Sequence, residues 1–75
     1  MTETFSVPFR APDWEAFKGA AAGFEAKCAL ASLSLHNEGV VHVQLLSGTE
    51  MIVSVQYRCQ DKITALRALM LAPSN

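Results

Sequence analysis

The stretch of sequence that decides the fold, residues 32–58, reads SLSLH, NEG, VVHVQLL, SGTE and MIVSVQYR. Its three longer runs alternate apolar and polar residues, and the two short segments between them contain Gly or Asn, which are typical of tight turns. We therefore predict a three-stranded antiparallel meander. Its hairpin loops would lie at Asn37-Glu38-Gly39 and at Ser47-Gly48-Thr49.

The alternation also assigns each side chain of the meander to one face of the sheet. The residues predicted to face the core are Leu33, Leu35, Val41, Val43, Leu45, Met51, Val53, Val55 and Tyr57. The residues predicted to lie on the opposite, open face are Ser32, Ser34, His36, Val40, His42, Gln44, Leu46, Ile52, Ser54, Gln56 and Arg58. A shift of the register by one residue would exchange the two sets.

A further strand is predicted before the meander, over residues 4–10. Phe5, Val7 and Phe9 occupy alternate positions there, and Pro8 falls on the other face. Because proline has no N–H to donate to a neighbouring strand, we expect this strand to be short or to lie at an edge of the sheet.

A helix is predicted from about Pro12 to Ala29, since proline suits a first helical turn and acidic residues follow it. The stripe expected to pack on the sheet consists of Trp14, Phe17, Ala21, Phe24 and Cys28. Small residues occupy the opposite side, and these are Gly19, Ala22, Gly23 and Ala26. They form either a second possible interface or a tolerated Ala/Gly surface that weakens the helix.

A second helix is predicted after the meander, with Asp61 as its N-cap and Pro73 as its stop. Its expected buried stripe is Ile63, Leu66, Leu69 and Met70, and residues 73–75 would form a frayed tail. The predicted fold is thus a single α+β domain, residues 1–75, of order β-α-β-β-β-α. It is a two-layer sandwich in which two helices cover one face of a mostly antiparallel four-stranded sheet.

Composition limits the classes of function. Hydrophobic residues make up 51% of the chain and charged residues 17%, with a formal net charge of -1. This balance offers no basic surface for nucleic acid or for an anionic membrane. The N-terminus does not resemble a signal peptide, and no apolar run approaches the roughly 18 residues of a membrane span. We expect a soluble, cytoplasmic protein.

Few residues suggest chemistry. Cys28 and Cys59 lie 31 residues apart, match no CxxC pattern, and are predicted to be reduced structural thiols rather than a disulfide. His36 and His42 share the predicted open face and would lie close together across the first hairpin, but no further ligand joins them. With no nucleophile or phosphate-loop motif, we predict no catalytic site, no metal, no cofactor and no enzyme activity.

The order α-β-β-β-α predicted from Pro12 onward is similar to that of double-stranded RNA-binding domains, and with the first strand it resembles the arrangement of ribosome hibernation factors. The RNA-binding family has a basic K-K-x-x-K cluster at the start of its last helix. Here the corresponding stretch is Gln60-Asp61-Lys62-Ile63-Thr64, so only Lys62 and Arg67 could contact phosphate. A nucleic-acid-binding module is therefore the alternative prediction, and nucleic acid is not the expected partner.

The favoured prediction is a small protein-interaction module, a stoichiometric regulator or inhibitor of a larger protein or complex, of a kind that phages and mobile elements also encode. We expect it to be homodimeric or bound to a protein partner through the open sheet face, which is low in charge and contains amides and hydroxyls. The predicted partner-binding residues are His36, Val40, His42, Gln44, Leu46, Ile52, Ser54, Gln56 and Arg58.

Overall fold

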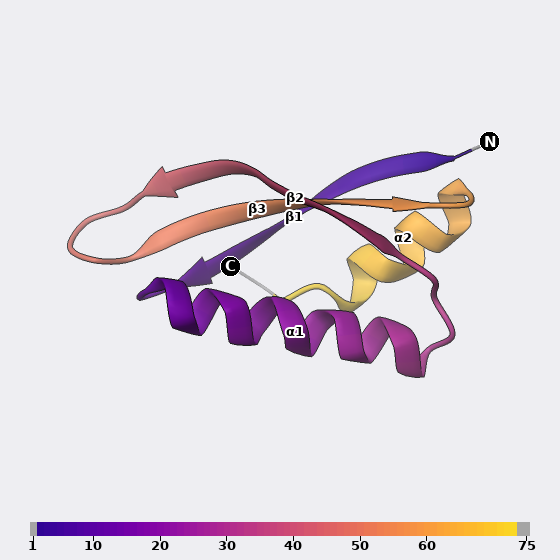
Figure 1. Ribbon diagram of the computed structural model, residues 1–75, viewed down its shortest axis with the longest axis horizontal. Helices are drawn as coiled ribbons and strands as arrows, with labels where there is room; N and C mark the ends of the chain where they lie inside the picture. Colours follow the sequence, from indigo (N-terminus) through magenta and orange to yellow (C-terminus); the bar gives the residue numbers. More distant parts are fainter. Residues whose placement is uncertain (1, 74–75) are drawn as a thin grey trace.

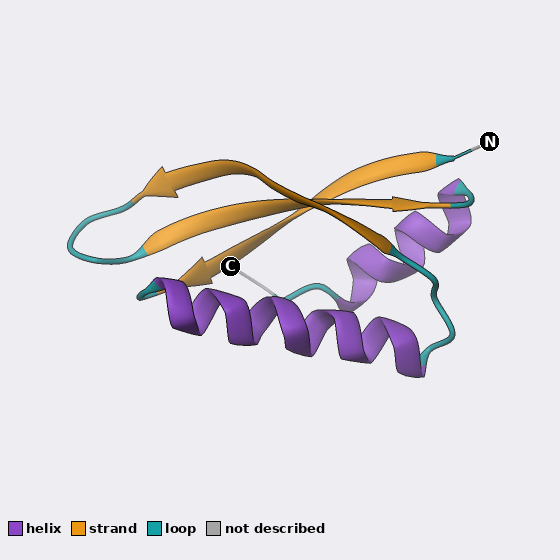
Figure 2. Cartoon of the chain, in the orientation of Figure 1, coloured by secondary structure: helices purple, strands orange, loops and turns teal. Residues whose placement is uncertain are grey.

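The computed structural model describes residues 2–73. Two helices lie together on one face of a twisted antiparallel sheet (Figures 1 and 2), which confirms the α+β class. In chain order the elements are β1 (Glu3–Ala11), α1 (Trp14–Leu30), β2 (His36–Leu45), β3 (Met51–Cys59) and α2 (Lys62–Leu71).

The sheet has three strands in the order β1-β3-β2, so β3 is central and both other strands lie at edges. Pairing of β1 with β3 places Val7 opposite Val55 and Phe9 opposite Val53. Pro8 is exposed in this edge strand, as the sequence predicted. The β2–β3 hairpin turns at Gly48, whose φ is 72°, and this second predicted loop is confirmed.

The prediction of a four-stranded sheet was wrong, because the run around Leu33 and Leu35 forms no strand of its own. The NEG segment lies inside β2, where the register with β3 shifts between Asn37 and Gly39. The Asn37 side chain accepts the N–H of Gly39 at 2.7 Å, and Gly39 has a φ of 98°. This local geometry forms a β-bulge rather than a hairpin turn. The likeness to the α-β-β-β-α order consequently loses its structural basis.

The core lies between the helices and the sheet face formed by β1 and β3. Phe9 packs edge-on against Phe17 and Phe24 of α1, with ring centroids 5.9 Å and 5.7 Å away. Phe24 also contacts Tyr57 of β3. The buried apolar residues are Val7, Phe9, Ala11, Phe17, Ala21, Phe24, Cys28, Leu33, Val53, Val55, Tyr57, Cys59, Ala65 and Ala68.

The first helix closely follows its prediction. Asp13 is its N-cap, with a carboxylate oxygen that accepts the N–H of Ala16 at 2.8 Å, so the helix proper begins at Trp14. The predicted stripe is buried except for Trp14, which is 46% exposed at the helix end. Both cysteines are free thiols and are buried, Cys28 in this stripe and Cys59 at the end of β3.

The second helix is capped by Asp61, as predicted, since its carboxylate accepts the N–H of Thr64 at 2.8 Å. The helix ends before Pro73, and Ala72 has the extended conformation expected before a proline. The predicted buried stripe was wrong: α2 buries Ala65 and Ala68 instead. Alanine side chains let the helix backbone approach the sheet closely, and the larger apolar residues are left outside. Those exposed residues are Ile63, Leu66, Leu69 and Met70.

Of the predicted frayed tail, residues 74 and 75 lie outside the described part of the chain.

Candidate interaction surface

Strand β2 differs from the rest of the sheet in its exposure. None of its ten residues, all of which the structure describes, is buried. The helices pack on β1, β3 and each other, and the hairpin that β2 forms with β3 projects beyond α1 at the left of Figure 1. The exposed fractions are 44% for Val40, 53% for Val41, 44% for Val43 and 79% for Leu45. An apolar row therefore reaches the surface at an edge of the sheet.

The outer edge of β2 also presents unpaired backbone groups. Leu46 donates its N–H to the carbonyl of Glu50 at 2.9 Å, which closes the hairpin toward β3. Hydrogen-bonded and non-hydrogen-bonded pairs alternate along an antiparallel ladder, so Gln44 is also bonded to β3. Val43 and Leu45, opposite Val53 and Met51, must then direct their N–H and C=O groups away from β3. Within residues 2–73, no other strand pairs with that side of β2.

A second bulge changes the predicted faces. The register shifts between Val40 and His42, which leaves Val41 without its own partner in β3. Val40 lies opposite the buried Val55, on the helix-facing side, so its predicted place on the open face was wrong. The bulge restores the predicted faces beyond it, because Val43 lies opposite Val53 and on the helix-facing side.

The other predicted partner-binding residues have these positions. On the helix-free face, β2 contributes His36, His42 and Gln44, which lie opposite Arg58, Ser54 and Ile52. Gln56, also on this face, lies opposite Gly39. Leu46 follows the end of β2 in the hairpin. All of the set except Val40 and Leu46 thus lies on the helix-free face of β2 and β3.

The two histidines do not face each other across a hairpin as predicted. His36 and His42 lie in one strand, six residues apart, which corresponds to about 20 Å. Among the described residues, no group of three or more His, Cys, Asp or Glu side chains is placed to hold a metal ion. The prediction that the two histidines lie close together was therefore wrong.

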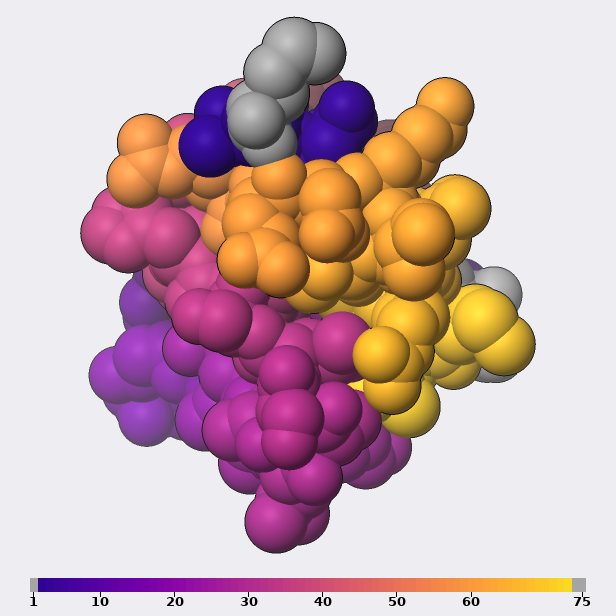
Figure 3. Space-filling view, turned by 90° about the vertical axis from the view of Figure 1, so that its right-hand side faces the viewer, coloured from indigo at the N-terminus to yellow at the C-terminus, as the bar shows by residue number. Residues whose placement is uncertain are grey.

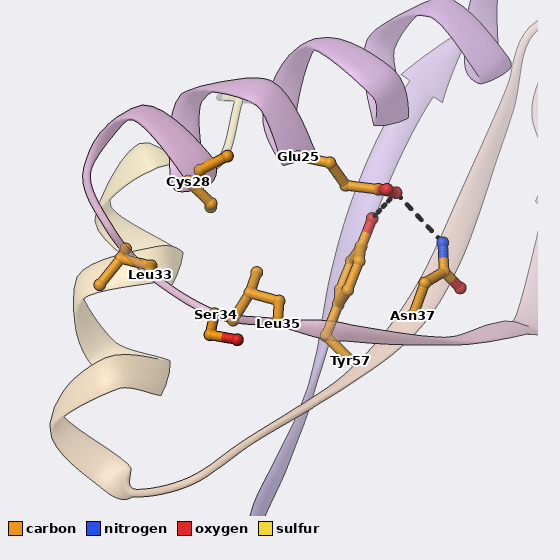
Figure 4. A pocket seen from close by; sticks show the side chains of 8 residues that line it. Glu25, Cys28, Leu33, Ser34, Leu35, Asn37 and Tyr57 are labelled. Carbon is orange, nitrogen blue, oxygen red and sulfur yellow. Dashed lines mark hydrogen bonds between the residues drawn. The ribbon is translucent and has the colours of Figure 1, made fainter.

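A cavity of about 330 Å³ lies between the C-terminal half of α1 and the start of β2 (Figure 4). Tyr57 points into it and donates its O–H to Glu25 at 2.8 Å. The amide nitrogen of Asn37 donates to the same carboxylate oxygen at 3.1 Å. Glu25 therefore links α1 to both β2 and β3 and supplies the partner that a buried tyrosine hydroxyl requires.

The electrostatics of this cavity do not favour nucleophilic chemistry. Burial, together with the hydrogen bond to Glu25, raises the pKa of Tyr57 well above its ordinary value. Burial, and then the charge of Glu25, also raises the pKa of Cys28. Both groups hold their protons at neutral pH, whereas a reactive cysteine needs a lowered pKa. The cluster thus acts as a structural tie between the layers.

The cavity continues into a shallow second one of about 300 Å³, and Glu25 and Asn37 line both. The second cavity lies between α1 and β2 over Val55 and is lined on its two sides by Ala22 and Val40. We name these two cavities the α1–β2 groove. It exists because the helices cover β1 and β3 and leave the inner side of β2 bare.

Two other surfaces are uncovered. The residues of the predicted small-residue interface, Gly19, Ala22, Gly23 and Ala26, are all exposed, although Ala22 also lines the α1–β2 groove and Gly23 lines a cavity beside Leu71. At the right-hand end of the molecule (Figure 3), α2 lies beside the connection from α1 to β2, where Arg67 and Met70 line a shallow cavity with Leu33. Neither surface contains a feature that identifies a ligand.

Comparison of the chain with protein-family models, curated proteins and solved structures found no match. In the described part of the chain, neither helix has the length and apolar character needed to cross a membrane.

Sequence reasoning missed the β2 edge itself. Val41, Val43 and Leu45 were assigned to the core because they alternate with polar residues, yet alternation does not distinguish a covered strand from an uncovered one. A usable signal was present in the prediction that the Pro8 strand is an edge. Two helices centred over that edge cannot also reach the far side of the sheet.

Proposed function

We propose that this chain is a protein-interaction module that binds by adding a strand of its partner to the outer edge of β2. The observation that carries the proposal is the combination of outward backbone groups at Val43 and Leu45 with exposed apolar side chains in the same strand. Strand addition uses both, because backbone hydrogen bonds supply affinity and alternate side chains supply specificity.

The lack of charge along this strand supports the proposal. From Gly39 to Leu45 there is no Asp, Glu, Lys or Arg, and Glu38 already lies 3.8 Å from Arg58 as an ion pair. Removing such a surface from water costs less than removing a charged one. A module of this kind would act stoichiometrically, as a regulator or inhibitor that covers a surface of a larger protein, or through association with itself.

The predicted open face adjoins this edge. His42 and Gln44 belong to both surfaces, since their side chains lie on the helix-free side of β2. We place the main contact at the edge because the open face lacks an apolar row, and its central positions at Ser54 and Gln56 are partly buried.

Paired lysine substitutions test the proposal. Val43→Lys places a charge on the β2 edge, and Ser6→Lys places one at an exposed position of β1, the opposite edge. Self-association measured by sedimentation velocity, and complexes isolated from the source cells, should be lost with Val43→Lys and retained with Ser6→Lys. An identical loss or retention with both variants would refute a role for β2.

A further inference from the structure

The exposed edge of β2 can pair with the same edge of β2 in a second copy of the chain. A strand can pair antiparallel with a second copy of itself about a two-fold axis normal to the sheet, and two-fold symmetric dimers in general are the commonest oligomers. We propose that the partner of β2 is a second copy of this chain, paired antiparallel through β2 with Val43 on the two-fold axis. This inference rests on the proposed function and names its partner.

The backbone supports an axis at Val43. Its N–H and C=O groups point away from β3, so two copies of Val43 placed opposite each other would exchange both hydrogen bonds. Leu45, whose groups also point outward, would lie opposite Val41 of the second copy. Two three-stranded sheets would thereby become one continuous sheet with β1 at both ends.

The side chains match in the same register. On the helix-facing side, Val43 meets Val43, so two exposed apolar groups cover one another. On the other side His42 meets Gln44, and an imidazole and an amide can share a hydrogen bond. Cross-strand pairs of this kind stabilise a sheet.

A neighbouring register fits less well. An axis at His42 would place two imidazoles opposite each other. That pairing would also run into the bulge, because Val40 lies on the helix-facing side and Gln44 on the helix-free side. An axis normal to the sheet keeps each side chain on its own face, so no axis midway between residues is possible.

The other edge of the sheet lacks this compatibility. Strand β1 contains Pro8, and it carries Glu3 and Arg10, the latter paired with Glu50 at 2.7 Å. Proline and charged residues are the usual means by which proteins block pairing at an exposed edge. In β2, residues 39–45 include no proline and no Asp, Glu, Lys or Arg.

The extent of the contact predicts its strength. Residues 41–45 of each copy would form the pair, far fewer than the roughly 20 to 30 residues per side of a standard interface. We therefore expect a reversible dimer whose population rises with protein concentration.

Disulfide trapping tests the register. Two Val43→Cys residues facing each other would have Cα atoms about 5.5 Å apart, within the range that a disulfide spans. In the matched control Leu45→Cys, the same residue of the two copies would be displaced by four residues, about 13 Å, which is too far. Background from the native thiols should be low because Cys28 and Cys59 are buried.

We expect Val43→Cys to form a covalent dimer under mild oxidation, and Leu45→Cys and the unmodified chain to remain uncrosslinked. Sedimentation equilibrium of the unmodified chain should show a monomer–dimer equilibrium, so the inference does not depend on either variant folding normally. Equal crosslinking of the two variants would overturn the register. A strict monomer that crosslinks at neither position would overturn the dimer.

The two proposals fail differently. The chain could be a strict monomer while a complex from the source cells is lost with Val43→Lys and kept with Ser6→Lys. In that case the proposal that β2 binds a partner strand is supported, and the proposal that this partner is a second copy of the chain is wrong. If neither self-association nor any complex depends on Val43, both are wrong.

Discussion

Strands β1 and β2 flank the same central strand and are nearly equal in length, at nine and ten residues, yet they have opposite environments. Val7, Phe9 and Ala11 of β1 are buried beneath the helices. In β2, which the structure describes completely, no residue is buried. Strand β2 is held in place by its hydrogen bonds to β3 and by the contact of Asn37 with Glu25.

This contrast separates stability from function. Burial of apolar area is the main stabilising contribution to a small fold, so β1 stabilises the fold more than β2 does. An apolar strand that contributes little to the core, and lacks proline and charge along its free edge, is instead suited to a contact outside the chain.

The largest effect is expected in β1. Phe9 is fully buried against Phe17 and Phe24, so Phe9→Ala should lower the free energy of unfolding by about 3–5 kcal/mol. Val43→Ala in β2 should cost well under half as much because Val43 is 44% exposed. Urea unfolding followed by circular dichroism measures both. Equal losses would contradict the division between the strands.

A smaller effect on stability is expected for the hydrogen bond between Tyr57 and Glu25, which lies beside β2. Tyr57→Phe removes the hydroxyl that donates to Glu25 and should cost about 1.5 kcal/mol. Glu25→Gln keeps an acceptor oxygen and should cost less. Urea titrations of the two variants measure the difference, and a Tyr57→Phe variant as stable as the unmodified chain would mean that the tie contributes nothing.

The same tie predicts a pH dependence. The pKa of Tyr57 is raised in the folded state, so the folded chain binds its proton more tightly than the unfolded chain. Its contribution to stability is complete below the unfolded pKa, about 10, and is lost as the pH rises above that value. Unfolding free energies measured across this range should fall more steeply for the unmodified chain than for Tyr57→Phe. If the unfolding free energies of the two proteins changed in parallel with pH, the pKa of Tyr57 would not be raised by folding.

The bulge in β2 can be tested with two glycines. Gly39 has a φ of 98°, and a methyl group added at its Cα would meet nothing within 4 Å beyond its chain neighbours, so Gly39→Ala should cost about 1 kcal/mol through backbone strain alone. Gly19 in α1 is equally unobstructed but helical, and Gly19→Ala should stabilise by about 0.5–1 kcal/mol. Thermal unfolding of both variants measures the difference, and a stabilising Gly39→Ala would contradict the bulge.

The smallest effect on stability is expected at the free edge. Val43→Lys and Ser6→Lys both alter exposed positions and should each change the unfolding free energy by less than about 0.5 kcal/mol. Unfolding in dilute solution, where the chain is monomeric, provides the measurement. A larger loss for Val43→Lys under those conditions would mean that Val43 stabilises the monomer.

Much of the fold could be predicted from the sequence because local signals determine it. Asp13 and Asp61 cap the helices, and Pro8 marks an edge strand. The remainder depends on competition between local and tertiary effects. NEG can form a turn or a bulge, and only pairing with β3 selects the bulge. Helix α2 has one alanine face and one face of larger apolar residues, and hydrophobicity alone favours the wrong one.

The candidate surface was predicted only in part for a similar reason. His42 and Gln44 were assigned to a functional face, whereas the neighbouring Val43 and Leu45 were assigned to the core. Which strand the helices leave bare follows from the strand order β1-β3-β2, and no residue in β2 encodes that order locally.

Amide hydrogen exchange in β2 tests whether the outer edge of this strand is the contact surface. In the monomer, Gln44 and Leu46 donate toward β3, whereas Val43 and Leu45 donate outward. We predict that the Gln44 amide is protected at every protein concentration and that the Val43 and Leu45 amides become protected as the concentration rises. Amides of Val43 and Leu45 that exchange freely at all concentrations, and also in any complex isolated with the chain, would contradict it.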